Sequence, residues 1–404
     1  MACLPWPAAA QSVTDPTAPP SPAAPADTAS APKTFTFTAS YTADTLANLH
    51  GGERTGVRYV DLLKLSAAYD GAAAGHDGLT GLISLQHHNG SRFSGELVGD
   101  VQVVTNSDAP PEALRLYEAW LQKELLGGKG DVKGGLIDLN TTFDVQETAA
   151  LFMNSSHGIG ADFSDTGLNG PSIDPTTALA ITGAYRPSED WTVQLGVFDG
   201  VAGDPPQRRQ FVAIKLSARD GALIVGQVEK RFGDTARVEG GVWSYTSAFD
   251  ALDQSGVVGS PRRLHGDAGV YGLVEGKLLA KPKADEGGLS GWLRLGIANG
   301  DINPVDNYVG AGLVYTGLIA GRDKDEVGVA IARAGFGGGA HAAARAAGIS
   351  LVDDETTLEA TYRYVFKDWL NIQPDVQYVI HPGGRAALGN ALVVGLRMAF
   401  TASR

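Results

Sequence analysis

The sequence predicts an all-β protein, a transmembrane antiparallel β-barrel of sixteen strands, and three observations carry that prediction. Glycine is abundant, with 53 residues among 404, and only 19% of all residues are charged. Apolar and polar residues alternate through most of the chain, as they do in strands whose two faces meet different surroundings. No run of about 18 or more apolar residues is present, which excludes a helical membrane protein.

Residues 1–33 are expected to lie outside the folded domain. The run Ala8-Ala9-Ala10 resembles a signal-peptide cleavage site, although no basic region precedes it, so we expect an upstream start and export. The following residues are rich in Pro, Ala, Ser and Thr and cannot bury enough surface to fold. We interpret 1–33 as a signal remnant and a disordered tail. The single cysteine, Cys3, excludes an intramolecular disulfide.

Residues 34–400 are assigned to the barrel, and 401–404 to a short C-terminal extension. In the last strand, Leu392, Val394 and Leu396 fall on one face. Gly395 and Arg397 fall on the other. The predicted strands are 34–48, 56–70, 78–89, 113–126, 131–140, 177–187, 191–199, 222–232, 236–247, 267–280, 289–298, 307–319, 326–335, 356–367, 371–381 and 390–400.

The lengths of the connections support this assignment independently. Barrels of this class have short periplasmic turns and long external loops, which alternate along the chain. The predicted long connections are 90–112, 141–176, 200–221, 248–266 and 336–355, and all follow odd-numbered strands. Residues 208–217 also alternate and could form an extra strand. Because that strand would make the total odd, we assign the segment to a loop.

Alternation also assigns the two sides of each strand. With so many two-faced strands and few helices to cover them, the apolar face is predicted to contact lipid and the polar face a water-filled lumen. An Arg or Lys on the lipid side near the midplane would cost about 2–4 kcal/mol. By this rule Tyr117, Ala119 and Leu121 face lipid, whereas Glu118 and Trp120 face the lumen.

The candidate pore-lining residues are of two chemical kinds. Aromatic rings can stack on the C–H faces of a small solute, and charged groups can bind its polar groups weakly enough for release. The candidates are Arg58, Lys64, Glu118, Trp120, Trp243, Arg294, Glu359 and Arg363. For each charged residue the alternative is an ion pair that stiffens the wall. For the Trp residues the alternative is packing under an inward loop.

The segment 141–176 is the third external loop, and we expect it to fold into the barrel and narrow it. Its glycines, including Gly158 and Gly160, permit tight bends. Asn154, Asp162 and Asp165 are the candidate constriction residues. The alternative is a surface lid that never reaches the lumen. No Ca²⁺-loop spacing is present, so no metal is predicted.

Several stretches resemble the outer-membrane carbohydrate-selective porins of the OprB type. They are Ser40-Tyr41-Thr42-Ala43-Asp44, Arg115-Leu116-Tyr117-Glu118-Ala119-Trp120-Leu121, Phe152-Met153-Asn154-Ser155-Ser156-His157-Gly158-Ile159-Gly160-Ala161-Asp162-Phe163-Ser164, Gly196-Val197-Phe198-Asp199-Gly200 and Gln373-Pro374-Asp375-Val376-Gln377-Tyr378. The resemblance runs in order from about residue 34 to 400. It implies a 16-stranded porin barrel in the bacterial outer membrane, through which monosaccharides such as glucose and small polyols diffuse.

Other functional classes find little support. The eight histidines form no HExxH pair, and neither a G-x-S-x-G motif nor a phosphate-binding loop is present. Glu118 and Glu359 could suggest a glycosidase carboxylate pair, but nothing fixes their separation. The net charge of −13 argues against nucleic-acid binding. We therefore predict no enzyme, no cofactor and no metal.

The sequence leaves three functions open. The first is passive diffusion of small carbohydrates. The second is a general or anion-preferring porin, which more Arg and Lys than Asp and Glu at the narrowest point would favour. The third is a structural or adhesive barrel with a lumen plugged by 141–176. The expected partners are the lipid bilayer, lipopolysaccharide, small sugars and the outer-membrane assembly machinery. Oligomeric state is not decided, with the resemblance favouring a monomer.

Overall fold

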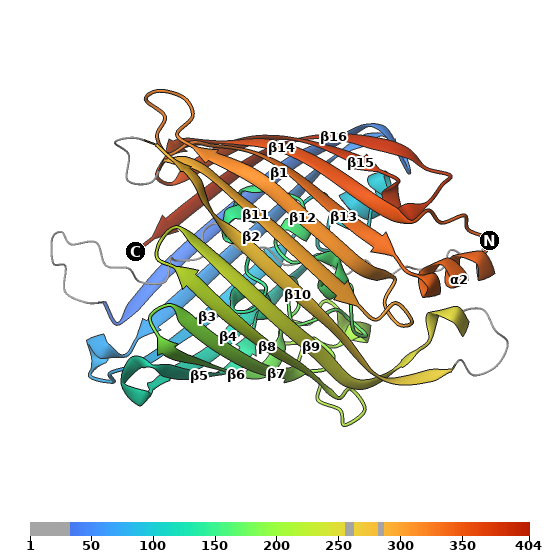
Figure 1. The fold of residues 1–404 in the computed structure, drawn as a ribbon. Helices are drawn as coiled ribbons and strands as arrows, with labels where there is room; N and C mark the ends of the chain where they lie inside the picture. The colour runs from blue at the N-terminus through green and yellow to red at the C-terminus, as the bar shows by residue number, and fades with distance from the viewer. Residues whose placement is uncertain (1–32, 255–261, 282–286) are drawn as a thin grey trace.

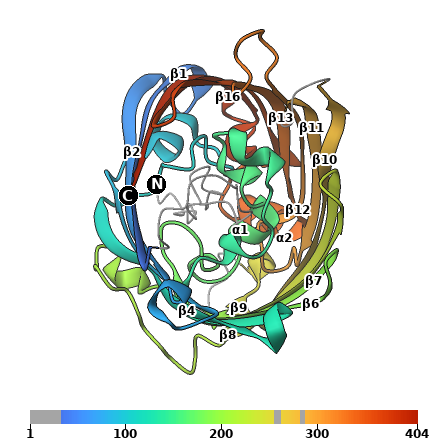
Figure 2. The same ribbon diagram turned by 90° about the vertical axis from the view of Figure 1, so that its left-hand side faces the viewer.

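The structure is a closed antiparallel barrel of sixteen strands, as predicted (Figures 1 and 2). It is a computed structural model and describes residues 33–254, 262–281 and 287–404. Each strand pairs with its sequence neighbours, and β1 closes the ring on β16. The strands are β1 (Phe35–Gly52), β2 (Gly56–Asp70), β3 (Leu79–His88), β4 (Ala113–Leu125), β5 (Gly130–Ile137), β6 (Ala178–Ser188), β7 (Trp191–Asp199), β8 (Ala222–Phe232), β9 (Ala236–Asp250), β10 (Arg263–Ala280), β11 (Gly288–Ala298), β12 (Val305–Thr316), β13 (Glu326–Phe336), β14 (Asp354–Lys367), β15 (Leu370–Ile380) and β16 (Gly389–Ser403).

The predicted boundaries differ from the observed ones mainly at strand ends. β16 continues to Ser403, which pairs with Thr38 of β1, so residues 401–403 belong to the wall and are not a separate extension. Nearly all of the tail expected over 1–33, including Cys3, lies outside the described residues. Residues 208–217 form no strand, in agreement with their assignment to a loop.

The two faces of the wall have opposite chemistry. Outward-facing Leu65, Ile181 and Ile297 are 43%, 65% and 61% exposed. Inward-facing Arg294 and Gln377 are fully buried, although both are strongly polar. This is the reverse of a soluble protein and matches a barrel whose outside contacts hydrocarbon.

A β-bulge in β4 corrects one side assignment. Ser84 of β3 faces Glu118 and Leu85 faces Leu116, so Tyr117 is an extra residue without a partner on β3. A bulge of this kind interrupts strict alternation. Tyr117, predicted to contact lipid, is therefore 3% exposed and donates a hydrogen bond to Asp138. Arg115, which shares its parity, is also buried.

Helices are few and short in the described residues. α1 (Ala161–Ser164) lies in the third external loop, within the ring of strands in Figure 2. α2 (Gly338–Ala346) follows β13, where an irregular loop was expected. Its alanine-rich sequence has high helix propensity, which explains the difference. Nothing helical in the described ranges has the length and apolarity needed to cross a membrane.

Candidate functional site

Carboxylates on the inner wall hold the third external loop, residues 138–177, against β10 and β14. Glu359 of β14 accepts hydrogen bonds from the backbone N–H groups of Met153 and Asn154, at 2.6 and 3.1 Å. Glu275 of β10 accepts hydrogen bonds from another pair of backbone N–H groups, those of Glu147 and Thr148, at 3.1 and 2.7 Å. Hydrogen bonds to ionised groups are among the stronger ones in proteins. Two strand carboxylates thus anchor consecutive parts of one loop.

Arg294 of β11 anchors the same loop through two aspartates. Its Nη2 and Nε atoms donate to the Asp144 carboxylate at 2.7 and 3.2 Å, and its Nη1 donates to Asp162. All three side chains are fully buried. The rings of Tyr271 and Tyr308 lie 5.5 and 5.2 Å from the guanidinium carbon. Arg294 and Asp162 therefore pack between loop and wall and do not border open space.

Two inward-facing tryptophans also lie under this loop. Trp243 stacks on Phe163, with 5.0 Å between ring centroids and 2° between ring planes. Trp292 contacts the rings of Phe152 and His157, at 5.0 and 5.7 Å. Trp243 is 1% exposed and Trp292 is 5% exposed. Neither ring has a face that a solute could reach.

The second external loop, residues 89–112, is also hydrogen-bonded to the inner wall, a contact that no local sequence pattern predicts. Glu355 of β14 accepts from the N–H groups of Val101 and Gln102, at 2.9 and 3.0 Å. Arg397 of β16 donates to Thr105 and Asn106, at 2.9 and 2.7 Å. The two loops bond to each other through backbone groups of residues 103–106 and 153–155. Together they rest on an arc of wall from β8 to β1.

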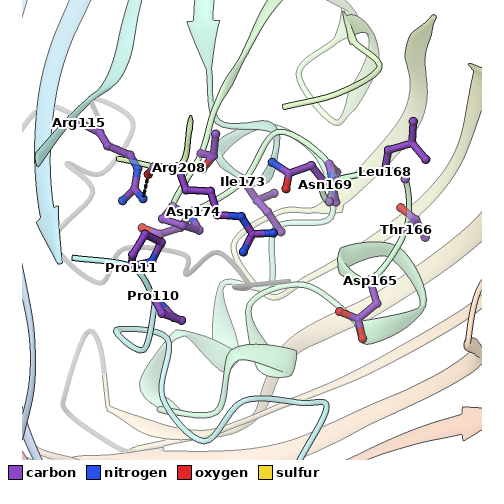
Figure 3. A pocket seen from close by; sticks show the side chains of 15 residues that line it. Pro110, Pro111, Arg115, Asp165, Thr166, Leu168, Asn169, Ile173, Asp174 and Arg208 are labelled. Atoms are coloured by element: carbon purple, nitrogen blue, oxygen red, sulfur yellow. Dashed lines mark hydrogen bonds between the residues drawn. The ribbon is translucent and has the colours of Figure 1, made fainter. Parts of the chain in front are cut away.

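An outer cavity remains beside these loops (Figure 3). Arg115 of β4 projects toward it and donates to the carbonyl oxygen of Arg208 at 2.7 Å. Asp165 and Asp174 of the third loop also line it. Further lining is supplied by Pro110, Pro111, Thr166, Gly167, Leu168, Asn169, Gly170, Pro171, Ile173, Pro175 and Thr176. Both basic and acidic residues therefore line the outer cavity.

An inner cavity lies toward the other end of the barrel. Its wall comes from β1, β2, β14, β15 and β16, and the second and third loops close its top. It is lined by Ser40, Thr42, Leu62, Lys64, Asn106, Ser107, Ala150, Leu151, Arg363, Asn371, Gln373, Arg397 and Ala399. No carboxylate is among these lining residues.

The wall between the cavities is polar and aromatic. Lys64 Nζ lies 5.4 Å from the centre of the Tyr117 ring. Lys133 Nζ lies 5.0 Å from the centre of the half-buried Trp120 ring, whose indole N–H donates to Glu118 at 3.2 Å. His88 lies between the Asp174 carboxylate and the Ser107 carbonyl oxygen, 3.2 Å from each. Strands β2 to β5 thus present hydrogen-bonding groups along one side.

The predicted site residues fall into separate groups. Lys64, Arg363 and Asp165 border the two cavities. Arg294, Glu359 and Asp162 hold the third loop, and Asn154 of that loop donates to Gln377. Glu118 and Trp120 lie on the wall between the cavities, and Glu118 is 7% exposed. Arg58 pairs with Glu96 at 3.2 Å, and both side chains are exposed.

Comparison with known proteins identifies the family. The carbohydrate-selective porin family, OprB family, matches residues 54–401. The chain belongs to the carbohydrate-selective porin family. It is therefore a sugar porin of the bacterial outer membrane, and its contacts are with the membrane and small solutes.

Individual relatives support both sequence and fold. This porin is 26% identical to Porin B of Pseudomonas aeruginosa over 91% of this chain and 87% of that protein. The high-pH structure of Pseudomonas putida OprB superposes with a TM-score of 0.81 at 22% identity, over 91% of this chain and 94% of that one. The outer membrane channel DcaP of Acinetobacter baumannii shares the fold more distantly, with a TM-score of 0.59, 10% identity and 91% and 97% coverage.

Sequence reasoning missed Arg115 and Arg397 as lining residues of this porin. Arg397 lies on the polar face of the last strand, so alternation already pointed it inward. Strict alternation through Tyr117 would point Arg115 toward lipid, and only the bulge at Tyr117 brings it inside. Among the described residues, no group of acidic, histidine or cysteine side chains has the arrangement of a metal site.

Proposed function

We propose that small sugars cross this porin by passive diffusion along one side of the barrel, from the outer cavity past β3 and β4 into the inner cavity. The observation that carries the proposal is the placement of the two cavities. Both lie beside the loops. The second and third loops are hydrogen-bonded to the wall from β8 round to β1, and they also bond to Gln86 and His88 of β3 and to Tyr117 and Glu118 of β4. The third loop is then the element that narrows the lumen.

The chemistry of this path suits a polyhydroxylated solute. The inner cavity offers the hydroxyls of Ser40, Thr42 and Ser107 and the amides of Asn371 and Gln373. These groups can exchange hydrogen bonds with sugar hydroxyls without a full positive or negative charge. Trp120 is the aromatic ring that we propose for contact with the apolar face of a sugar. Weak, replaceable contacts of this kind permit release.

We propose no catalytic role for the carboxylates on the wall. Glu359 accepts two backbone N–H groups of the third loop, and Glu118 accepts from Trp120 and from the N–H of Asp138. Both are committed to structural hydrogen bonds, which supports a channel and disfavours general acid or base chemistry.

The outward-facing surface supports two further partners. Its exposed Leu, Ile and Val side chains fit lipid chains, and Tyr59, Tyr185 and Trp369, which are 49%, 47% and 53% exposed, fit the interfaces at strand ends. We propose that lipopolysaccharide surrounds the outer half of this surface. We also propose that the outer-membrane assembly machinery inserts the barrel.

The test is a matched pair of tryptophan variants in liposome-swelling assays with neutral hexoses. Trp120→Ala is expected to change the rate of sugar uptake, because it removes a ring from the proposed path. Trp243→Ala is expected to lower stability by about 3–5 kcal/mol, the usual cost of deleting a buried aromatic side chain.

The intact, heat-resistant barrel on a gel serves as the folding control for both variants. Failure of the wild type to admit neutral hexoses would overturn the proposed function. Wild-type uptake by a folded Trp120→Ala variant would remove Trp120 from the path.

A further inference from the structure

The inner cavity is unusual in the charge of the groups that border it. Lys64, Arg363 and Arg397 line it, and no acidic side chain does. In the outer cavity, by contrast, two acidic residues, Asp165 and Asp174, line the space together with Arg115 and Arg208. The whole chain carries a formal charge of −13, so the basic lining runs against the general composition. A cavity with walls of low dielectric constant concentrates the field of such groups.

The partner carboxylates of the two arginines lie outside the lining. Asp44 accepts from Arg397 Nε and Nη2 at 2.8 Å each and is fully buried. Glu326 of β13 accepts from Arg363 Nη2. These ion pairs fix the guanidinium groups in place. Arg397 Nη2 also donates to Thr105 and Asn106 of the second loop. An arginine has five N–H donors, so the pair with Glu326 leaves Arg363 further donors for a solute.

The remaining lining groups indicate what else the solute carries. Asn106, Asn371 and Gln373 present amides, and Ser40, Thr42 and Ser107 present hydroxyls. Such groups suit several hydroxyls held close together. Gln373 Nε2, Asn106 Oδ1 and Ser107 Oγ already bond to protein groups. An inorganic anion would use few of the donors and acceptors that remain. The cavity therefore combines cationic groups with a surface for a polyhydroxylated body.

We propose that the inner cavity is a binding subsite for acidic carbohydrates, in which Lys64 and Arg363 receive a sugar carboxylate or a sugar phosphate. Arg397, which Asp44 holds in place, lines the same subsite. This inference rests on the proposed diffusion path and names the preferred substrate class within it. Neutral sugars use the same hydrogen-bonding groups without the ionic contribution.

The test measures the concentration of sugar that halves the open-channel current in planar bilayers at low salt. Galacturonate is compared with galactose, and glucose 6-phosphate with glucose. We expect each acidic sugar to block at about fivefold lower concentration than its neutral counterpart, the size expected from one or two partly solvated ion pairs. The difference should shrink in 1 M salt, where charges are screened within about 3 Å.

Lys64→Gln and the double variant Lys64→Gln/Arg363→Gln are expected to abolish this preference, so that galacturonate blocks at about the same concentration as galactose. The matched control is Lys230→Gln, which removes a charge whose Nζ lies over the Trp191 ring, 4.7 Å from its centre, and outside the cavity lining. It should keep the wild-type preference.

Two outcomes would overturn the subsite. One is equal block by acidic and neutral sugars in the wild type. The other is block by acetate as strong as by galacturonate, which would reduce the effect to general anion attraction. In either case block by galactose would leave the proposed function standing, whereas no block by any sugar, with no uptake of neutral hexoses, would remove both.

Discussion

Arg294 shows how one residue selected for its chemistry can have a structural task. Alternation correctly turned it inward, because a guanidinium in hydrocarbon is costly. Its partners Asp144 and Asp162, however, are 150 and 132 residues away in sequence. No local pattern reveals that a loop will return to cover the side chain. The same limit applies to Trp243, whose partner Phe163 also comes from the third loop.

Arg294→Ala is expected to loosen the third loop and widen the channel. The substitution leaves two buried carboxylates unpaired, and breaking a buried ion pair in this way costs about 3–5 kcal/mol. Single-channel conductance should therefore rise, and the folded barrel should melt at lower temperature. Arg186→Ala is a suitable control, because it also breaks an ion pair. Arg186 pairs with Asp131 at 2.8 Å, but its side chain is 44% exposed. Unchanged conductance in a folded Arg294→Ala barrel would contradict the anchoring role.

Single elements were predicted well where alternation holds and poorly where it is interrupted. All sixteen strands follow from the period of two, whereas the loop assignment of 208–217 follows from the even number of strands that a closed barrel of this class requires. The bulge at Tyr117 leaves no mark in the sequence, because Arg115, Tyr117 and Glu118 are compatible with either register. The contacts of the second and third loops depend on residues more than a hundred positions apart, which local periodicity does not encode.

The bulge can be tested by cysteine labelling in a Cys3→Ser background. Arg115→Cys should react with a water-soluble, membrane-impermeant thiol reagent, and the added charge should alter conductance. Leu114→Cys should resist the reagent in a lipid bilayer, because Leu114 is 48% exposed on the outside of the barrel. Strict alternation through Glu118 makes the opposite prediction for the two positions. If only Leu114→Cys reacted, strict alternation would hold and Tyr117 would face lipid, as the sequence predicted.

The second loop should become less firmly held as pH rises. Burial raises the pKa of Asp108 to about 7 and also raises that of Asp100. The ordinary value in an unfolded chain is about 3.9, so the folded loop binds these protons more tightly. The stabilisation that the raised pKa values of Asp100 and Asp108 give to the folded loop is complete below about pH 4. It declines as the pH rises toward 7. Hydrogen exchange, corrected for intrinsic rates, should show residues 94–108 better protected at pH 5 than at pH 8.

Asp108→Asn should remove much of that pH dependence. The amide oxygen can still accept the Ser94 N–H bond, which the carboxylate accepts at 2.8 Å. Equal protection of the wild-type loop at both pH values would show that these aspartates do not control it.

At the scale of the whole molecule, the reversed distribution of polar and apolar residues determines where the protein is stable. Leu195 of β7 is 57% exposed on the outer face. Leu195→Arg should cost about 2–4 kcal/mol in a bilayer if the position lies near its midplane. The fraction of heat-resistant barrel after folding into liposomes measures this cost. Leu195→Ala serves as the control for loss of the side chain alone. A wild-type yield from Leu195→Arg would show that this face does not contact hydrocarbon.

The pairing of β1 with β16 determines when the barrel can insert into the membrane relative to its synthesis. Thr38 and Ser403 are partners across the seam, so the first and last strands to leave the ribosome complete each other's hydrogen bonds. Until the final strand arrives, every shorter nascent chain has two open edges, which hydrocarbon cannot satisfy. Insertion must therefore wait until β16 is available to pair with β1, and a chain that lacks β16 yields no partial pore.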